Sequence, residues 1–346
     1  MTPALTTVFG ATGFLGARVV GRLLAQASSS RTGAEPGAAV RVMVRPGSDT
    51  SMLDDLDVET VVGELDDADA VSRAMSGAAR VIYSVVDTRA WIRDRKPLWR
   101  TNVEILRGVL DVAARHDLER FVYTSSMCTI GRVRGRPASE SDAFNWASTA
   151  NAYVLSRVAG ERTALDAAGR GVPVVAMCVS NTYGPGDVKP TPHGAFVAGA
   201  ALGKLPFGLR GMCAETVGVD DAAEALIRAS RGGRIGERYI VSADYLDLGE
   251  IIRIAADEAG VAPPRPTLPR PAMYALGAGG DLRSRITGTP QRLSVDTVRL
   301  MHCMSPMDHR RASDEYDWHP GSVEDSVRAA ARYWVQRRAA RRAVTR

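Results

Sequence analysis

A short apolar strand that runs into a glycine-rich turn and then into a helix is the feature that most constrains this chain. Val8 and Phe9 lead into Gly10-Ala11-Thr12-Gly13-Phe14-Leu15-Gly16, and a helical pattern rich in Ala, Val and Leu follows. Glycines at these positions let backbone N–H groups approach a pyrophosphate, whose charge then lies at the positive end of the helix. The turn therefore predicts a dinucleotide-binding site formed by Gly10, Thr12, Gly13, Phe14, Leu15 and Gly16.

Composition predicts a globular protein with a large core. Of 346 residues, 45% are hydrophobic and 24% are charged. No apolar run approaches the roughly 20 residues that a membrane helix needs. The N-terminus lacks the basic region, apolar stretch and cleavage site of a signal peptide. A cytoplasmic protein without a membrane partner is therefore expected.

Charge and cysteine usage exclude two further classes. The formal net charge is +5, but the basic residues are spread along the chain apart from an arginine-rich end, which we expect to be a solvated, frayed tail. No nucleic-acid partner is predicted. The cysteines form no C-x-x-C pair and have no histidine at metal-ligand spacing, so no metal site is predicted. We expect buried, reduced thiols at Cys128, Cys178, Cys213 and Cys303.

Alternating apolar strands and amphipathic helices continue after the first turn. They predict an α/β fold of the Rossmann type, a doubly wound parallel sheet with helices on both faces. Ser28–Ala39 has the composition of turns and is interpreted as a surface insertion. Buried strands are predicted at Val40–Arg45, Val58–Gly63, Arg80–Val86, Phe121–Ser125 and Val174–Val179.

The end of the second predicted strand bears on the choice of dinucleotide. An acidic residue there would accept hydrogen bonds from the adenine ribose 2′-hydroxyl and select NAD. Here the strand ends in Arg45, with Ser48 shortly after it. A guanidinium suits a 2′-phosphate and Ser48 adds a donor, so NADP(H) is predicted. The alternative is a surface arginine without a ligand.

Further motifs give the chain a resemblance to a known family. They are Arg120-Phe121-Val122-Tyr123-Thr124-Ser125-Ser126, Tyr153-Val154-Leu155-Ser156-Arg157, Tyr183-Gly184-Pro185-Gly186-Asp187 and Val219-Asp220-Asp221-Ala222-Ala223. Together with the G-x-x-G-x-x-G turn, they resemble the extended, atypical branch of the short-chain dehydrogenase/reductases, within the NAD-dependent epimerase/dehydratase superfamily. Within it, the chain is most similar to the dihydroflavonol reductase and 3β-hydroxysteroid dehydrogenase branch.

The resemblance implies a division into two parts. In this family the chain leaves the sheet to build a substrate cap, returns for one strand and then adds more cap. Pro266, Pro269 and Pro271 precede an Ala/Leu/Gly-rich helix, which is expected to form a mobile lid. The dinucleotide-binding Rossmann domain is expected at 1–180, and its sheet is completed by about 236–260. A smaller, mostly C-terminal substrate cap is expected at 181–235 and 261–335, with the lid at 263–300. A basic tail is expected at 336–346.

The resemblance also implies roles for individual residues. In the family a tyrosine gives a proton to the substrate carbonyl as hydride arrives from the nicotinamide, and a serine hydrogen-bonds the same oxygen. Tyr153 and Ser126 occupy those motif positions. Asn102 resembles the family's asparagine after the fourth strand, and a plain helix-start role is the alternative. Cofactor contacts are implied for Glu64, Leu65, Thr124, Tyr153, Arg157 and Asn181.

One position departs from the family. The family's lysine, four residues after the tyrosine, holds the nicotinamide ribose and lowers the tyrosine pKa, and this chain has Arg157 there. Lowering a tyrosine pKa from about 10 to about 7 requires roughly 4 kcal/mol, and one charge at about 4 Å in an effective dielectric of about 20 supplies about that. Arg157 is expected to replace the electrostatics but not a proton relay. Part of the proton supply would then come from water or an acidic group of the substrate. The alternative places Arg157 in solvent.

The expected activity follows from these residues. Met127-Cys128 follow Ser126 where the family's sugar-nucleotide dehydratases carry an Asp-Glu pair, so dehydration is not expected. A single acid with NADP fits one-way ketone reduction. We therefore predict an NADPH-dependent ketoreductase with an atypical active site. A nucleotide-sugar epimerase and a non-catalytic NADP-binding regulator remain alternatives.

Apolar residues of the expected cap point to a bulky, flat, mostly apolar ketone such as a polyphenol, a steroid or an aromatic polyketide. The alternative is that they are ordinary core. Because arginines far outnumber Lys96, Lys189 and Lys204, a GC-rich genome and a role in antibiotic biosynthesis are our preferred hypothesis. The apolar residues of the expected cap are Leu202, Leu205, Phe207, Leu209, Met212, Met273, Tyr274, Leu276, Met301, Met304 and Met307.

The oligomeric state is left open by the sequence. Many relatives pair through the helices that carry Asn102 and Tyr153. Arg157, Arg162 and Asp166 make the outer face of the second helix only moderately apolar. A homodimer and a monomer are both compatible with this pattern.

Overall fold

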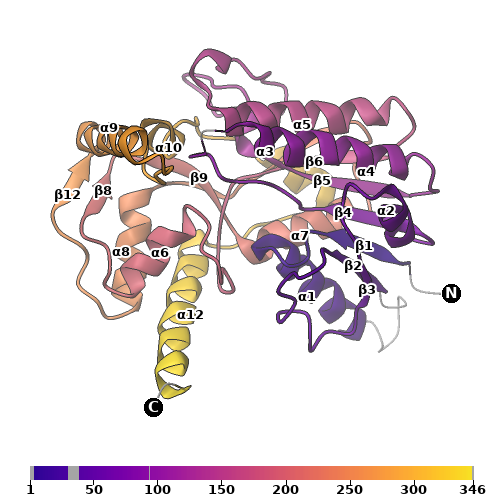
Figure 1. The fold of residues 1–346 in the computed structure, drawn as a ribbon, viewed down its shortest axis with the longest axis horizontal. Helices are drawn as coiled ribbons and strands as arrows, with labels where there is room; N and C mark the ends of the chain where they lie inside the picture. The colour runs from indigo at the N-terminus through magenta and orange to yellow at the C-terminus, as the bar shows by residue number, and fades with distance from the viewer. Residues whose placement is uncertain (1–3, 30–38, 93, 345–346) are drawn as a thin grey trace.

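A seven-stranded parallel sheet forms the centre of the computed structural model, which describes residues 4–29, 39–92 and 94–344 (Figure 1). Its strand order is β10-β6-β5-β4-β1-β2-β3, and every neighbouring pair is parallel. The predicted Rossmann-type fold is therefore confirmed. The strands are β1 (Thr6–Phe9), β2 (Val40–Val44), β3 (Glu59–Val62), β4 (Arg80–Tyr83), β5 (Arg120–Ser126), β6 (Val174–Val179) and β10 (Arg238–Val241).

Helices cover both faces of this sheet, each over its own apolar cluster. One face is covered by α1 (Phe14–Ser29) and α7 (Val219–Ala229), which pack against each other. The other face is covered by α2 (Ala68–Met75), α4 (Leu106–Ala113) and α5 (Ala152–Ala168). Short helices α3 (Lys96–Trp99) and η2 (Arg100–Ile105) lead into α4 without a break.

The predicted strands are present, with two differences. Val58–Gly63 was expected to be buried, but β3 is exposed along most of its length because β2 is its only strand partner among the described residues, at the sheet edge. Val62 is 58% exposed. The predicted Arg80–Val86 strand ends earlier, at Tyr83. Of the predicted insertion, residues 28–29 end α1, and 30–38 lie outside the described residues.

A second, smaller part follows β6 and packs around its own apolar cluster. It contains the strand groups β11-β9-β7 and β12-β8. Their bounds are β7 (Asn181–Tyr183), β8 (Gly208–Arg210), β9 (Cys213–Gly218), β11 (Asp244–Asp247) and β12 (Thr267–Pro269). The helices of this part are α6 (Gly194–Ala201), α8 (Leu248–Glu258), α9 (Arg270–Thr287), α10 (Val295–Leu300) and α12 (Val323–Val344). Helix α11 (Arg310–Tyr316) packs instead against β10 of the main sheet and against α7.

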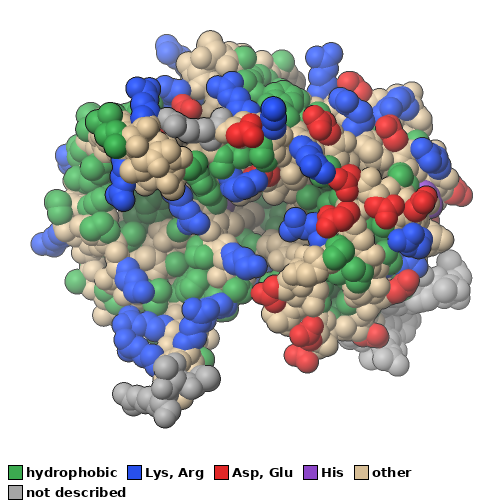
Figure 2. Space-filling model, viewed as in Figure 1, with side chains coloured by type: hydrophobic (Ala, Val, Ile, Leu, Met, Phe, Trp, Pro, Cys, Tyr) green, Lys and Arg blue, Asp and Glu red, His purple; other side chains and the backbone are tan. Residues whose placement is uncertain are grey.

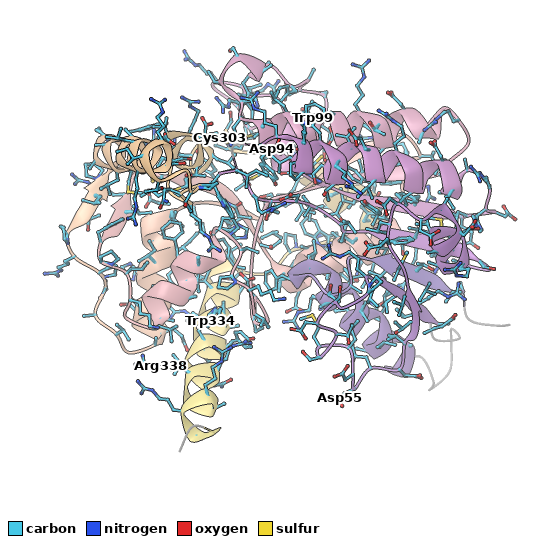
Figure 3. The ribbon with its side chains drawn as sticks, in the orientation of Figure 1. Asp55, Asp94, Trp99, Cys303, Trp334 and Arg338 are labelled. Atoms are coloured by element: carbon cyan, nitrogen blue, oxygen red, sulfur yellow. The ribbon has the colours of Figure 1, made fainter. Side chains whose placement is uncertain are left out.

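The arginine-rich end differs from the frayed tail expected of it. It continues α12 as a helix to Val344. Basic side chains gather around this end (Figure 2), and Arg338 is exposed there (Figure 3). The expected solvation is therefore present, but on a helix. Within the described residues, no helix combines the length and apolar composition that crossing a membrane requires.

The first turn brings β1, β4 and α1 into backbone contact. Gly10 has φ 86°, and a Cβ there would lie 2.8 Å from the carbonyl carbon of Ser84. A Cβ on Gly16 would overlap the carbonyl oxygen of Gly10. Gly13 is exposed, so the outer side of the turn presents backbone. Two glycines thus permit the packing, and the third leaves the surface open to a ligand.

We predict opposite effects for two glycine substitutions in α1. Gly16→Ala is expected to lower the free energy of unfolding by about 1–3 kcal/mol or more, because its Cβ meets backbone that cannot move aside. Gly21→Ala is the matched control, since a Cβ there meets nothing within 4 Å, and it is expected to stabilise by roughly 0.5–1 kcal/mol. Urea denaturation measures both. A neutral Gly16→Ala would contradict the packing account.

Candidate active site

Helix α5 carries two of the three predicted catalytic residues, Tyr153 and Arg157. Its start is fixed by Asn151, whose side chain accepts a hydrogen bond from the backbone N–H of Val154 at 3.0 Å. Tyr153 and Arg157 follow one helical turn apart, so both side chains lie on one face of the helix. Tyr153 is partly buried against an apolar cluster that includes Met127.

Ser126 meets Tyr153 from the end of β5. Its hydroxyl accepts a hydrogen bond from the Cys128 backbone N–H at 3.4 Å and begins the short helix η3 (Met127–Thr129). The Ser126 hydroxyl lies near enough to the Tyr153 phenol to lower its pKa. The structure thus brings Ser126, Tyr153 and Arg157 together.

Two opposing effects act on the pKa of Tyr153. Burial, with a smaller contribution from Cys128, raises the Tyr153 pKa to about 12. The Arg157 charge lowers the pKa, as expected, but the loss of hydration outweighs it. Without a ligand, Tyr153 is therefore a protonated phenol at neutral pH.

Arg157 is buried rather than solvent-facing, so the alternative that placed it in solvent is wrong. It is 2% exposed, and Nη2 donates to the Thr124 carbonyl oxygen at 2.5 Å. Its guanidinium carbon lies 5.4 Å from the centre of the Tyr123 ring. Nε and Nη1 are buried and have no hydrogen-bond partner among the described residues. Buried N–H groups of a charged side chain normally have acceptors, so a ligand oxygen fits here.

Asn102 holds α5 against the sheet and does not begin a helix. It lies inside η2, a π-helical turn. Its side chain accepts from the Asp87 backbone N–H at 2.8 Å and donates to Ser156 Oγ on α5 at 3.0 Å. A Cβ on Gly160 would overlap the Asn102 carbonyl oxygen. The two helices therefore meet at backbone distance beside the candidate site.

Glu161 is a residue of this region that the sequence analysis missed. It is 5% exposed and forms an ion pair with Arg238 Nη1 at 2.9 Å. It also accepts hydrogen bonds from Ser125 Oγ at 2.5 Å, Thr129 Oγ1 at 2.6 Å and Cys178 Sγ at 3.1 Å. The sequence signal that could have pointed to Glu161 is its spacing, because it follows Arg157 by four residues and so lies on the same face of the helix.

Glu215 on β9 was also missed. Its carboxylate accepts from the Met307 backbone N–H at 2.7 Å and from the Ser242 hydroxyl. Burial raises its pKa to about 7. Met307 belongs to the cluster against which Tyr153 packs. Glu215 thus positions a loop that borders the candidate site.

Three of the four cysteines are buried as expected, and Cys213 is only partly buried. All four are free thiols. Burial raises the pKa of Cys128 to about 12 and that of Cys303 to about 11. These two thiols are therefore protonated at neutral pH.

The predicted cofactor residues lie along the carboxyl ends of the parallel strands. Arg45 is exposed after β2, and its guanidinium has no partner among the described residues. Ser48 closes a turn onto the Arg45 carbonyl oxygen at 3.1 Å. Glu64 and Leu65 follow β3, Thr124 bonds Ser84 Oγ at 2.8 Å at the end of β5, and Asn181 begins β7. This edge of the sheet is where doubly wound folds bind ligands.

These features fit a dinucleotide. The first turn of α1 directs N–H groups that lack intrahelical acceptors toward the exposed Gly13. Arg45 and the two unpaired N–H groups of Arg157 add cationic donors at two separate points. Asn181 and Glu64 lie at the same edge, but within the described part of the chain their side chains make no contact that assigns them a role.

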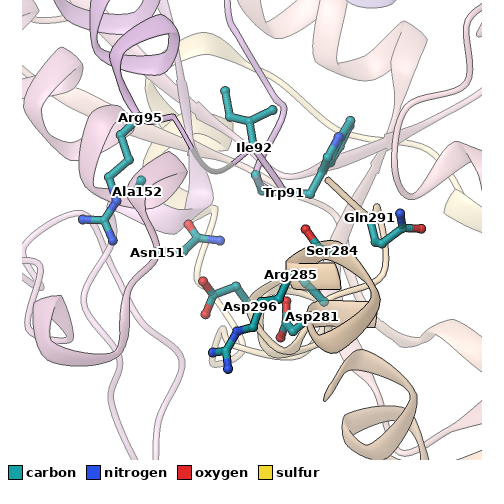
Figure 4. A pocket seen from close by; sticks show the side chains of 12 residues that line it. Trp91, Ile92, Arg95, Asn151, Ala152, Asp281, Ser284, Arg285, Gln291 and Asp296 are labelled. Carbon is teal, nitrogen blue, oxygen red and sulfur yellow. The ribbon is translucent and has the colours of Figure 1, made fainter. Parts of the chain in front are cut away.

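A cavity of about 450 Å³ lies between the segment after β4, the start of α5 and the α9–α10 pair (Figure 4). The volume is within the range of small-molecule sites. Much of its wall is polar or charged. It is lined by Ala90, Trp91, Ile92, Arg95, Asn151, Ala152, Asp281, Ser284, Arg285, Gln291, Ser294 and Asp296.

The predicted apolar lining does not surround this cavity. Leu209, Met212 and Met273 are buried in the core of the second part, and Leu276 is 41% exposed. The alternative of ordinary core therefore holds for most of these residues, because the second part needs its own core. The rest pack as follows: Leu205, Phe207, Tyr274 and Met301 against that core, Met304 and Met307 in the cluster beside Tyr153, and Leu202 partly buried.

Comparison with known proteins identifies the family. Residues 6–242 match the model of the NAD dependent epimerase/dehydratase family. A relative from Synechocystis named as a dihydroflavonol 4-reductase is 32% identical, with 95% of this chain and 94% of the relative covered. The sterol demethylase protein B of Methylococcus capsulatus is 28% identical, with 94% and 95% covered. The crystal structure of gox2253 has a TM-score of 0.81 at 30% identity, with 96% and 98% covered.

The chain belongs to the NAD dependent epimerase/dehydratase family. The resemblance drawn from its motifs is therefore confirmed, including the dihydroflavonol reductase-like branch. Members of this family bind a nicotinamide cofactor and include oxidoreductases and epimerases.

The buried ion pair generates a stability prediction. Glu161→Gln is expected to lower the free energy of unfolding by about 3 kcal/mol or more, because Arg238 keeps a buried charge without a counter-charge. Asp166→Asn is the control on the same helix, since its pair with Arg162 is exposed, and it should change the free energy by at most about 1 kcal/mol. Urea denaturation at pH 7 gives both values. Equal effects would contradict the assigned network.

Proposed function

We propose that the protein is an NADPH-dependent ketoreductase that reduces a carbonyl of a bulky, largely apolar substrate to an alcohol. The observation that carries the proposal is the position of the partly buried Tyr153, which has Ser126 and the buried Arg157 beside its phenol. A protonated phenol suits proton donation, which is the direction of reduction. The relatives named for a flavonol and a sterol support a bulky substrate.

The proposed reaction divides between the cofactor and these side chains. When bound, a reduced nicotinamide would supply the hydride that the carbonyl carbon accepts. The Ser126 hydroxyl donates a hydrogen bond to the carbonyl oxygen and orients it. Tyr153 transfers its phenolic proton to that oxygen, which completes the alcohol. Arg157 stabilises the phenolate that remains, and because a guanidinium does not release a proton at working pH, water restores the proton.

The cofactor is proposed to lie along the carboxyl edge of the sheet. The Gly10–Gly16 turn would hold the pyrophosphate, and Arg45 with Ser48 would hold the 2′-phosphate of NADP. Arg157 would direct its two unpaired N–H groups to the nicotinamide ribose. A cytoplasmic location and a role in antibiotic biosynthesis stay proposals.

The first test is kinetic. Tyr153→Phe is expected to lower kcat for NADPH oxidation with polycyclic ketones by about 10²- to 10⁴-fold, because the proton donor is removed. Tyr333→Phe on α12 is the control and should leave kcat unchanged. Unchanged turnover in Tyr153→Phe would refute the acid assignment. Tight NADPH binding without turnover of any ketone or sugar nucleotide would favour a regulator, and interconversion of sugar nucleotides would favour an epimerase.

The second test concerns the cofactor. Arg45→Gln is expected to lower kcat/KM for NADPH by about tenfold or more, because a hydrogen bond to a charged group is lost. The value for NADH should change little, since that cofactor has no 2′-phosphate. Steady-state kinetics with both cofactors makes the comparison within one variant. A parallel loss for NADH would contradict the assignment.

A further inference from the structure

The cavity beside α5 carries two arginines without an acidic partner. Arg95 lines it from the segment that follows β4, and Arg285 lines it from α9 (Figure 4). Neither side chain forms an ion pair or a hydrogen bond within the described ranges. The donors of both guanidiniums are therefore unpaired in the part of the chain that the structure describes, although two aspartates line the same wall.

The aspartates in the same wall are engaged elsewhere. Asp281 Oδ2 accepts the backbone N–H of Val295 at 3.0 Å, at the first residue of α10. Asp296 pairs with Arg299 at 3.3 Å. Each carboxylate therefore has a partner within the chain, whereas Arg95 and Arg285 have none among the described residues. An incoming anion would meet donors that are free.

The cavity also has an apolar surface and lies beside the proposed acid. Trp91 lines it, and the guanidinium carbon of Arg292 lies 5.3 Å from the centre of its ring, which supports the indole. Asn151 and Ala152 line the cavity and directly precede Tyr153. The glycine turn and Arg45 do not contribute to the wall. The arginines are therefore not placed to bind the phosphates at the glycine turn.

We propose that this cavity binds the body of the substrate and that Arg95 and Arg285 bind an oxyacid anion on it, a carboxylate or a phosphate. Hydrogen bonds from a guanidinium to such an anion are shorter and stronger than neutral ones. Trp91 and Ile92 cover the apolar body of the same molecule. The substrate class is thus an amphipathic ketone with an anionic group remote from the carbonyl. This inference rests on the proposed ketone reduction for the identity of the reacting group.

Direct binding tests the anion site without requiring turnover. Aromatic ketones on one-, two- and three-ring scaffolds are each prepared as a carboxylate, a phosphonate and the neutral methyl ester. Isothermal titration of the full chain, with and without NADPH, is expected to show at least one scaffold on which an anion binds about tenfold or more tightly than its ester. The stronger of the two anions identifies the oxyacid.

Variants assign the preference to the two arginines. Arg95→Gln and Arg285→Gln should each reduce anion affinity several-fold, the double variant should bind anion and ester equally, and ester affinity should not change. Arg283→Gln, on the same helix but outside the cavity wall, and Lys96→Gln are the controls and should retain the preference.

The outcomes separate this inference from the proposed reduction. Equal binding of anions and esters on every scaffold, or a preference that survives in the double variant, would overturn the anion site even if the ketones are reduced. An arginine-dependent preference without NADPH oxidation would support the anion site and count against ketone reduction.

Discussion

The close approach of α5 to the central sheet is the constraint on which the candidate site depends. At Gly160 the helix lies so near η2 that a side chain would overlap the Asn102 backbone. The Asn102 amide then joins Asp87, after β4, to Ser156 on the helix. Because Tyr153 and Arg157 belong to this rigid helix, their distance from the ends of β4 and β5 is set by backbone packing.

The hydrogen bonds and the ion pair of Glu161 explain why Arg157, on the same helix, lacks a carboxylate partner. Arg157 and Glu161 are four residues apart, a spacing at which opposite charges commonly pair. Here Glu161 is already bound by Arg238, by two hydroxyls and by a thiol. The carboxylate therefore has little capacity left, and Arg157 keeps two N–H groups without partners. The network that fixes β5, β6 and β10 also leaves a cation available beside Tyr153.

Local sequence predicted the features that depend on local interactions. The glycine turn and the apolar strands follow from conformational freedom and periodicity, and the structure contains both. The exposure of β3 did not follow, because an edge strand and a central strand share the same apolar pattern and differ only in their neighbours. The position of Met212 in a separate core, and the net pKa of Tyr153, depend on contacts between segments far apart in the sequence. The same holds for the pairing of Glu161 with Arg238.

The exposed edge at β3 has a consequence for how copies of this protein can meet. A bare edge strand offers unpaired backbone groups to which another chain could add, and charged side chains discourage such addition. Asp55 and Asp57 precede β3, Glu59 begins it, and Asp66 and Asp67 follow it, although Glu59 and Asp66 are paired with Arg41 and Arg100. At the other end of the sheet, α11 lies against β10. Charged side chains at one end and a covering helix at the other therefore disfavour the growth of a continuous sheet through several molecules.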